Sequence, residues 1–463
     1  MAWKNRRTGP NAPGFLVSKH CSVTELAGKT PLLWWGLAIL PTLFLIFMLC
    51  RYSLDVPYLD QWEFAVLLGK ALEGHTAFQD FWGLHNEHRP LFPRLLLLLL
   101  ARLSHWNILW ELWANLLCGV AIFAVSVYAW QRVAAAKASH AQYPVVLPLS
   151  LLVFSMSQWQ NWFFGWQVQE FMQILAVMLG LIFLDGDGLN ARRVAGAVAM
   201  GIIATFSFAS GLVFWPVGLL AILLKSQTSR ARRVRWVLSW TLVSLLVLSA
   251  YLYRFRTVDY HPAPWRPAEL TASYTHYVLS FLGAPLATYS PVGSMLAGLL
   301  GLVLFAGLTV HLIRSRAAAM RDVALPICLA AFSLGAALMT GFGRIAFGVE
   351  QAMSSRYVTL ANPLWIAIVI LMGLEGSLVV NQGRKTLRRL SISMLALLAF
   401  LIVCNAAYGT LKWTERYHYL APARTALISG DDPAILQRLH PDPRIVIVRR
   451  EILRRHKLSV FRE

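Results

Sequence analysis

The sequence predicts an all-α polytopic membrane protein that crosses the bilayer about eleven times. Of its 463 residues, 57% are hydrophobic and only 14% are charged, and continuous apolar runs of spanning length recur along the chain. Such runs exclude a β-barrel, whose strands alternate between apolar and polar residues. The net charge of +20 lies mostly in short segments between the runs, so it indicates membrane orientation and predicts no nucleic-acid partner.

Eleven apolar segments qualify as predicted spans, although some of them are short. They are 31–50, 108–130, 144–157, 169–184, 194–208, 211–224, 236–253, 292–313, 323–341, 358–380 and 390–411. The basic linkers are 131–143, 185–193, 225–235, 314–322 and 381–389. Under the positive-inside rule these linkers lie in the cytoplasm, together with the basic N-terminal residues 1–30. We expect the protein in a bacterial inner membrane, with its active site on the extracytoplasmic face.

The leucine run at 91–103 is too short for a full span and starts with two prolines. If it crossed the bilayer, every later basic linker would move outside, so we expect an interfacial or re-entrant helix. The segment 276–290 receives the same interpretation. The C-terminus is then outside, which leaves 31–411 as the transmembrane domain and 412–463 as a small extracytoplasmic appendage with two short helices.

On this topology four segments face the outside. They are 51–107, 157–170, 254–291 and 341–357. The second segment interleaves aromatic and amide side chains, among them Trp159, Gln160, Trp162 and Gln167. Two interpretations stay open for it: an aromatic belt at the membrane interface, or a sugar site in which rings stack on the sugar and amides bind its hydroxyl groups.

The first external loop concentrates acidic residues next to the membrane, whereas the whole chain holds only 22 Asp and Glu. Its six carboxylates are Asp55, Asp60, Glu63, Glu73, Asp80 and Glu87. Asp60, followed three residues later by Glu63, fits a capping box at the start of a helix, a purely structural role. The cluster at 85–90 has no such explanation, because charged groups at the bilayer edge are costly unless they are paired or used.

These motifs resemble the GT-C superfamily of polyprenyl-phosphate-dependent glycosyltransferases, which includes the protein O-mannosyltransferases and the aminoarabinose transferases. The shared pattern is an aromatic-Asp motif (YLDQWE, 58–63) soon after the first span, followed by a His/Arg-Pro entry (HNEHRPLF, 85–92) to an apolar helix. In that family the loop Asp is the catalytic base, and Asp60 is the matching position. The chain departs from the pattern at Gln61, where many relatives carry a second acid.

The resemblance implies roles for further residues. Glu87 would be a second catalytic carboxylate that orients the acceptor or binds a divalent cation, unless it only pairs with Arg89 or a neighbouring histidine. The groups expected to bind the donor phosphate are Arg344, Arg356, Tyr357 and Arg89. Their alternative role is anchoring to lipid headgroups. His85 and His88 would share a metal ion only on a helix, and no metal site is predicted.

Two functions of different classes follow. The first is an inverting glycosyltransferase that moves a sugar from a polyprenyl-phosphate donor to an extracytoplasmic acceptor, such as a lipid-linked glycan, a polysaccharide or a protein. The alternative is a transporter or flippase of lipid-linked saccharides. Transporters place charged groups and broken helices near the bilayer midplane, often in two related halves. Here the acidic residues gather in one external loop, which favours the enzyme.

Overall fold

The computed structural model describes residues 32–135, 144–186, 188–225, 229–256, 270–381, 385–430 and 432–462. These residues form helices and contain no β-strand, as the sequence predicts. The expected cytoplasmic segment 1–30 lies outside the described residues. The α-helices are α2 Leu32–Tyr52, α3 Gln61–Leu72, α4 Phe78–Trp82, α5 Leu91–Ser104, α6 Ile108–Ala135, α7 Val146–Val153, α8 Trp159–Phe163, α9 Val168–Leu184, α10 Ala191–Thr205, α11 Phe214–Lys225, α12 Arg230–Leu252, α13 Leu270–Ala287, α14 Pro291–Arg314, α15 Ala324–Arg344, α16 Val358–Asn381, α17 Lys385–Ser429, α18 Pro433–Leu436 and α19 Pro443–Arg455. Short 3₁₀ helices are η1 Met156–Gln158, η2 Gly165–Gln167, η3 Ala209–Val213, η4 Ile345–Phe347, η5 Val349–Met353, η6 Ser355–Tyr357 and η7 Ser459–Phe461.

Eight helices in the described part of the chain are long and apolar enough to cross a membrane. They are α2, α6, α9, α12, α14, α15, α16 and α17, with α9, α15 and α16 extended by neighbouring 3₁₀ turns. The chain is therefore a multi-pass helical membrane protein. Of the eleven predicted spans, three form shorter helices instead: α7, α10 and α11.

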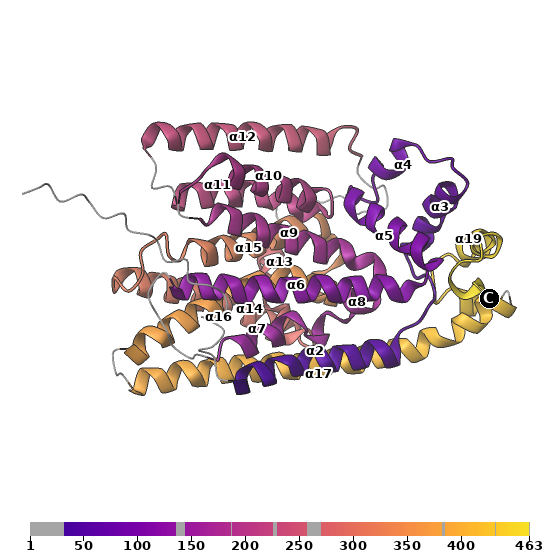
Figure 1. The fold of residues 1–463 in the computed structure, drawn as a ribbon. Coiled ribbons are helices and arrows are strands. Elements are labelled where there is room, and N and C mark those ends of the chain that lie inside the picture. Colours follow the sequence, from indigo (N-terminus) through magenta and orange to yellow (C-terminus); the bar gives the residue numbers. More distant parts are fainter. Residues whose placement is uncertain are drawn as a thin grey trace, which may run out of the picture.

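The helices run nearly parallel in one bundle, with α12 along one edge and α2 and α17 along the opposite edge (Figure 1). Helix α16 lies at the centre, and the apolar window of this helix is completely buried. In contrast, α2, α12, α14 and α17 leave most of their apolar surface uncovered. Because an apolar face without protein contacts is stable only against hydrocarbon, these faces mark the lipid-exposed perimeter.

The leucine run forms α5, a helix of 14 residues. At 1.5 Å per residue this helix is about 21 Å long, short of the roughly 30 Å hydrocarbon core. Leu97, Leu98 and Ala101 are buried on one face, whereas Leu95 and Leu99 are exposed on the other. Figure 1 shows α5 beside α3 and α4 at one end of the bundle, where the interpretation as an interfacial helix places it.

The predicted boundary between bundle and appendage, at residue 411, falls inside a continuous helix. Helix α17 runs for 45 residues from Lys385 to Ser429 and continues through Pro422. The two short helices predicted beyond it are present as α18 and α19. We call residues 432–462 the tail; they fold back onto the first external loop (Figure 1).

Ion pairs between tail arginines and loop carboxylates hold the tail in this position. Arg449 lies 2.6 Å from Glu63, Arg462 lies 2.5 Å from Asp55, and Arg455 lies 3.4 Å from Glu73. The arginines of the tail thus neutralise carboxylates of the acidic loop.

Candidate functional site

The site begins at a tight turn immediately before α3. The N–H of Gln61 donates to the carbonyl of Tyr58 at 3.1 Å, and Leu59, between them, adopts φ 47°. Asp60 has helical backbone angles, and its side chain makes no capping hydrogen bond. Glu63 pairs with Arg449 instead of closing a capping box. The structural explanation for Asp60 is therefore wrong, and its carboxylate is available for another role.

A second turn, at 85–88, faces the first. His85 and His88 form an isolated β-bridge, with the N–H of each donating to the carbonyl of the other at 2.8 and 2.9 Å. The ring of His85 packs on Trp166, and its Nε2 lies 3.5 Å from Oδ2 of Asp60. His85 and His88 were expected to share a metal ion only if they lay on a helix, and this segment is not helical. Among the described residues, no group of three His, Cys, Asp or Glu side chains is arranged to hold a metal ion.

His88 is fixed as a neutral imidazole. Its ring stacks on Phe208 with centroids 4.1 Å apart, and its Nδ1 accepts the N–H of Ala209 at 3.2 Å. Burial lowers its pKa to about 4, against the opposing charge of Glu87. The remaining proton therefore resides on Nε2, which lies 3.6 Å from Oε1 of Glu87.

Glu87 and Arg344, predicted for two different roles, bind each other. The guanidinium of Arg344 donates to Oε1 of Glu87, while Oε2 is buried without a hydrogen-bond partner. Burial raises the pKa of Glu87, but the neighbouring His88 imidazole and the Arg344 guanidinium outweigh it, and the net pKa is below its ordinary value. Glu87 is thus an ionised carboxylate whose buried Oε2 keeps an unused acceptor site.

Arg89 does not belong to the site. Its guanidinium is buried and donates to the carbonyls of Trp82, Tyr251 and Tyr253. These contacts tie the first external loop to the end of α12. The prediction that Arg89 binds phosphate is wrong, because backbone carbonyls already occupy its donors and its neighbours come from a distant part of the chain.

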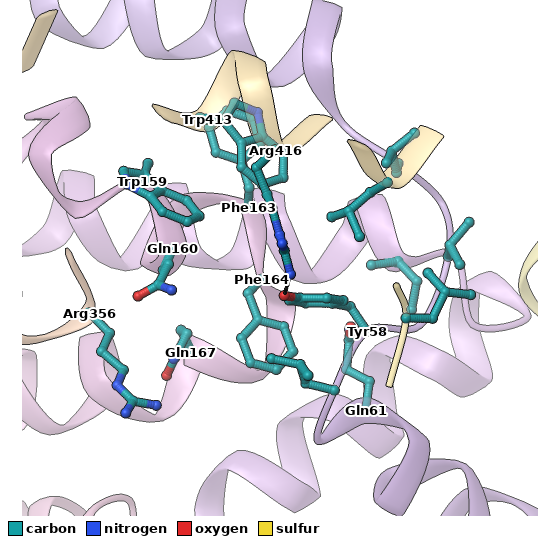
Figure 2. A pocket seen from close by; sticks show the side chains of 16 residues that line it. Tyr58, Gln61, Trp159, Gln160, Phe163, Phe164, Gln167, Arg356, Trp413 and Arg416 are labelled. Atoms are coloured by element: carbon teal, nitrogen blue, oxygen red, sulfur yellow. Dashed lines mark hydrogen bonds between the residues drawn. The ribbon is translucent and has the colours of Figure 1, made fainter. Parts of the chain in front are cut away.

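A pocket of about 690 Å³, including its open mouth, lies between the turn before α3, the segment 158–167 and α17. Figure 2 shows Gln160, Gln167 and Arg356 on one side of it, with Tyr58 and the Arg416 side chain that binds the Tyr58 hydroxyl on the other. Trp159 is also part of the wall. Three of the four residues predicted to contact a sugar therefore line one cavity.

Trp162, the fourth of these residues, is in the core. Its side chain is 0% exposed, its Nε1 donates to the carbonyl of Ser155 at 3.0 Å, and its ring packs on Phe171. It contributes to neither a sugar site nor an interfacial belt. The prediction for Trp162 is wrong because its ring is packed in the core against Phe154, Phe171 and the backbone of Gly119, away from the pocket.

Arg356 is one of two arginines in the pocket wall; the other, Arg416, is bound to the Tyr58 hydroxyl. The guanidinium of Arg356 lies over the ring of Tyr357 at 5.1 Å, and its Nε is buried without a hydrogen-bond partner. Figure 2 shows the guanidinium beside Gln167. Tyr357 is itself buried and stacks on Phe281, so it supports Arg356 and does not line the pocket.

Asp60 differs from the other carboxylates of the first external loop. Asp55, Glu63, Glu73, Asp80 and Glu87 each lie within ion-pair distance of a Lys or Arg. Within the described residues, Asp60 has only the contact with His85, and its side chain is 43% exposed. Burial raises the pKa of Asp60, but the contact with His85 and the charge of Arg356 outweigh this effect and lower the pKa. Asp60 is therefore ionised at neutral pH and open to a substrate.

Two buried acids beneath the pocket escaped the sequence analysis. Glu111 accepts hydrogen bonds from Gln61 Nε2 at 2.5 Å and from Trp106 Nε1 at 2.8 Å. Glu170 accepts from Asn161 at 3.2 Å, and its Oε1 has no hydrogen-bond partner. A lone carboxylate inside a predicted span is the signal that would have found both, since such groups are costly in a membrane unless used.

Comparisons of the chain with protein-family models, with curated proteins and with solved structures give no match. The function is therefore argued from the chemistry of the site. A solvent-accessible carboxylate, a second ionised carboxylate and an arginine in a pocket with amide and aromatic walls can bind a sugar phosphate and accept a proton.

Proposed function

We propose that the protein is an inverting glycosyltransferase that uses a polyprenyl-phosphate sugar as donor and an extracytoplasmic glycan or lipid-linked acceptor. The observation that carries the proposal is the state of Asp60: ionised, accessible and not paired with Lys or Arg in the described part of the loop. It lies close enough to Arg356 for the two charges to interact.

The chemistry requires one base and one anion site. Asp60 removes the proton of the acceptor hydroxyl as the hydroxyl oxygen bonds to the anomeric carbon, and the bond from that carbon to the phosphate oxygen breaks. Attack from the face opposite the phosphate inverts the anomeric configuration. Arg356 holds the phosphate as its negative charge increases, which lowers the barrier most where water is excluded.

The pocket wall suits a sugar. Trp159 presents a half-buried ring, and Gln160 is held by Ser354, whose hydroxyl lies 3.1 Å from its Oε1. Gln167 is buried at the pocket wall. Amides fixed in this way bind hydroxyl groups without losing much side-chain freedom on binding. Trp159, Gln160 and Gln167 therefore support the interpretation of the segment 157–170 as a sugar site.

We infer further that the three short helices also cross the membrane, which gives the eleven crossings. Residues 145–158 run alongside α16: Val145 packs against the backbone of Gly373, and the carbonyl of Leu152 accepts from Asn362 at 3.1 Å. Thr359 Oγ1 then donates to Gln158. Residues 145–158 thus run antiparallel to α16 between Gly373 and Thr359, which supports α7 as a crossing. On the eleven-crossing topology the site faces the extracytoplasmic side.

One observation favours the alternative, a transporter or flippase. The chain between α7 and α9 is broken into η1, α8 and η2, and Glu170 is buried next to this break. Discontinuous helices with a buried charge are a property of transporter sites. The accessible acid, however, lies in the external loop, where a transporter has no use for a base.

Deletion of the gene separates the two functions. Loss of a transferase leaves the lipid-linked sugar donor accumulating on the outer face, and loss of a flippase leaves the lipid-linked saccharide on the cytoplasmic face. The purified transferase releases free polyprenyl phosphate from that accumulated lipid, and the Asp60→Asn variant does not. A purified protein that moves the intact lipid between leaflets and releases no polyprenyl phosphate would establish the alternative.

A further inference from the structure

We infer that the tail, residues 432–462, is part of the active site, because it holds Leu59 in a left-handed conformation that turns the Asp60 carboxylate towards His85. The inference rests on the proposed function for what Asp60 does. The orientation that the tail gives to the Asp60 carboxylate is independent of that function.

The turn before α3 is strained. Leu59 adopts φ 47° at the second position of a turn closed by Tyr58 and Gln61, where the sequence preference is for glycine. A side chain in this region costs on the order of 1 kcal/mol or more and persists only when surrounding contacts impose it. The contact that does so is the hydrogen bond from the Leu59 N–H to the carbonyl of Leu439 in the tail, at 2.9 Å.

The strained turn excludes a competing conformation. Asp is among the best N-cap residues, and capping stabilises a helix by about 1 kcal/mol. An Asp60 with extended backbone angles would accept the free N–H groups of α3. Instead its backbone is helical, with φ −62° and ψ −19°, and its carboxylate points to His85. The tail therefore selects the conformation in which Asp60 is available to a substrate.

The bundle holds the other side of the turn. The Tyr58 N–H donates to Gln61 Oε1 at 3.0 Å, and Gln61 Nε2 donates to the buried Glu111. Gly165 permits this arrangement, because a Cβ there would lie 2.0 Å from Oε2 of Glu111. Contacts with Glu111 on one side and with the carbonyl of Leu439 on the other hold the turn in a single conformation.

Apolar packing and the ion pairs keep the tail docked. Leu436, Leu439 and Leu453 are almost completely buried, and Ile452 packs directly on the backbone of Gly69 in α3. The ion pair between Arg449 and Glu63 adds a further contact, and its two charges can be exchanged by mutating both residues. A half-exposed pair of this kind contributes modestly by itself, so its loss loosens the tail without unfolding the bundle.

The test replaces Asp60 with cysteine in a chain whose five native cysteines are changed to serine or alanine. A thiol at position 60 and the imidazole of His85 are close enough to share one Cd²⁺ ion. The Cd²⁺ concentration that halves labelling of the thiol by an impermeant maleimide then measures how often residue 60 faces His85. No sugar transfer is needed for this readout.

With the tail docked, protection by Cd²⁺ requires His85, and His85→Ala raises the half-protecting concentration roughly tenfold or more. Arg449→Glu and Leu439→Asp raise the half-protecting Cd²⁺ concentration similarly, and the exchange Glu63→Arg/Arg449→Glu returns it to the original value. Arg444→Glu is the matched control, because Arg444 lies on the same helix but pairs only with Asp442. Thermal stability is measured on every variant.

An unchanged Cd²⁺ concentration in both Arg449→Glu and Leu439→Asp overturns the inference, as does a charge exchange that fails to restore protection. These results are independent of the glycosyltransferase proposal. If Cd²⁺ protection follows the expected pattern and Asp60→Asn still transfers sugar, the tail positions Asp60 but Asp60 is not the base.

Discussion

Oδ2 of Asp60 lies 3.5 Å from Nε2 of His85, and in the described part of the chain this histidine is its only ion-pair partner. The five other carboxylates of the same loop are each within 4 Å of a Lys or Arg. Arginines of α15 and of the tail thus neutralise the loop around Asp60 and leave one carboxylate for chemistry.

Asp60→Asn is expected to lower the rate of sugar transfer by roughly a hundredfold to ten-thousandfold, because an amide does not accept the proton of the acceptor. Thermal stability is expected to change little, since the Asp60 side chain makes no capping bond. Glu63→Gln is the control: it weakens one half-exposed contact with Arg449 and leaves transfer within severalfold. Full activity of Asp60→Asn would move the search for the base to Glu87.

Arg356→Ala is expected to raise the KM for the donor about tenfold or more, with thermal stability largely retained, because Arg356 is the arginine at the pocket wall beside Gln167, whereas Arg416 is bound to the Tyr58 hydroxyl. Arg344→Ala is expected to act mainly on stability, by about 1 to 3 kcal/mol, because it leaves the partly buried Glu87 without its partner. Equal effects of both variants on KM, measured with the same donor, would contradict this division of roles.

The two tryptophans of α8 are expected to respond in opposite ways. Trp162→Ala removes a completely buried ring and costs about 3 to 5 kcal/mol of stability. Trp159→Ala, at the half-buried pocket wall, is expected to lower affinity for the sugar with little loss of stability. Thermal unfolding and donor titration of both variants check the assignment, and a stable Trp162→Ala would refute it.

His88 is expected to make stability depend on pH. Its folded pKa of about 4 lies below the unfolded value near 6.5, so the unfolded chain binds more protons between these values. Stability is full above pH 6.5 and falls as the pH decreases towards 4, by up to about 3 kcal/mol. His88→Asn removes this slope. His75→Asn, a change at a side chain that is 77% exposed, is expected to leave it intact.

The topology is tested by cysteines at Ser229 and Thr76, both at exposed positions. In intact cells an impermeant thiol reagent is expected to label the cysteine at 76 and not the one at 229, because the basic residues at the start of α12 stay in the cytoplasm. Labelling at 229 from outside would remove the eleven-crossing topology and would make α5 or α13 a full span.

The sequence was sufficient for the helical membrane class, because that class depends on local composition, namely long apolar runs. The concentration of acidic residues in one loop likewise made Asp60 a candidate. The sequence was insufficient where neighbours come from far along the chain. Arg89 is occupied by carbonyls of Tyr251 and Tyr253, and the tail docks on α3 from almost 400 residues away. No pattern near Arg89 indicates that its donors are already used.

The length of α17 has a further consequence. This helix spans about 68 Å and passes without interruption from the inner end of the bundle to the tail. The tilt of a spanning helix adjusts to the thickness of the surrounding bilayer. A change in tilt of about 10° would move the outer 18 residues of α17 by roughly 5 Å at their far end, given a rise of 1.5 Å per residue. Trp413, Arg416 and Leu420 lie on this outer part and line the pocket. We therefore expect the lipid composition of the membrane to change the width of the pocket.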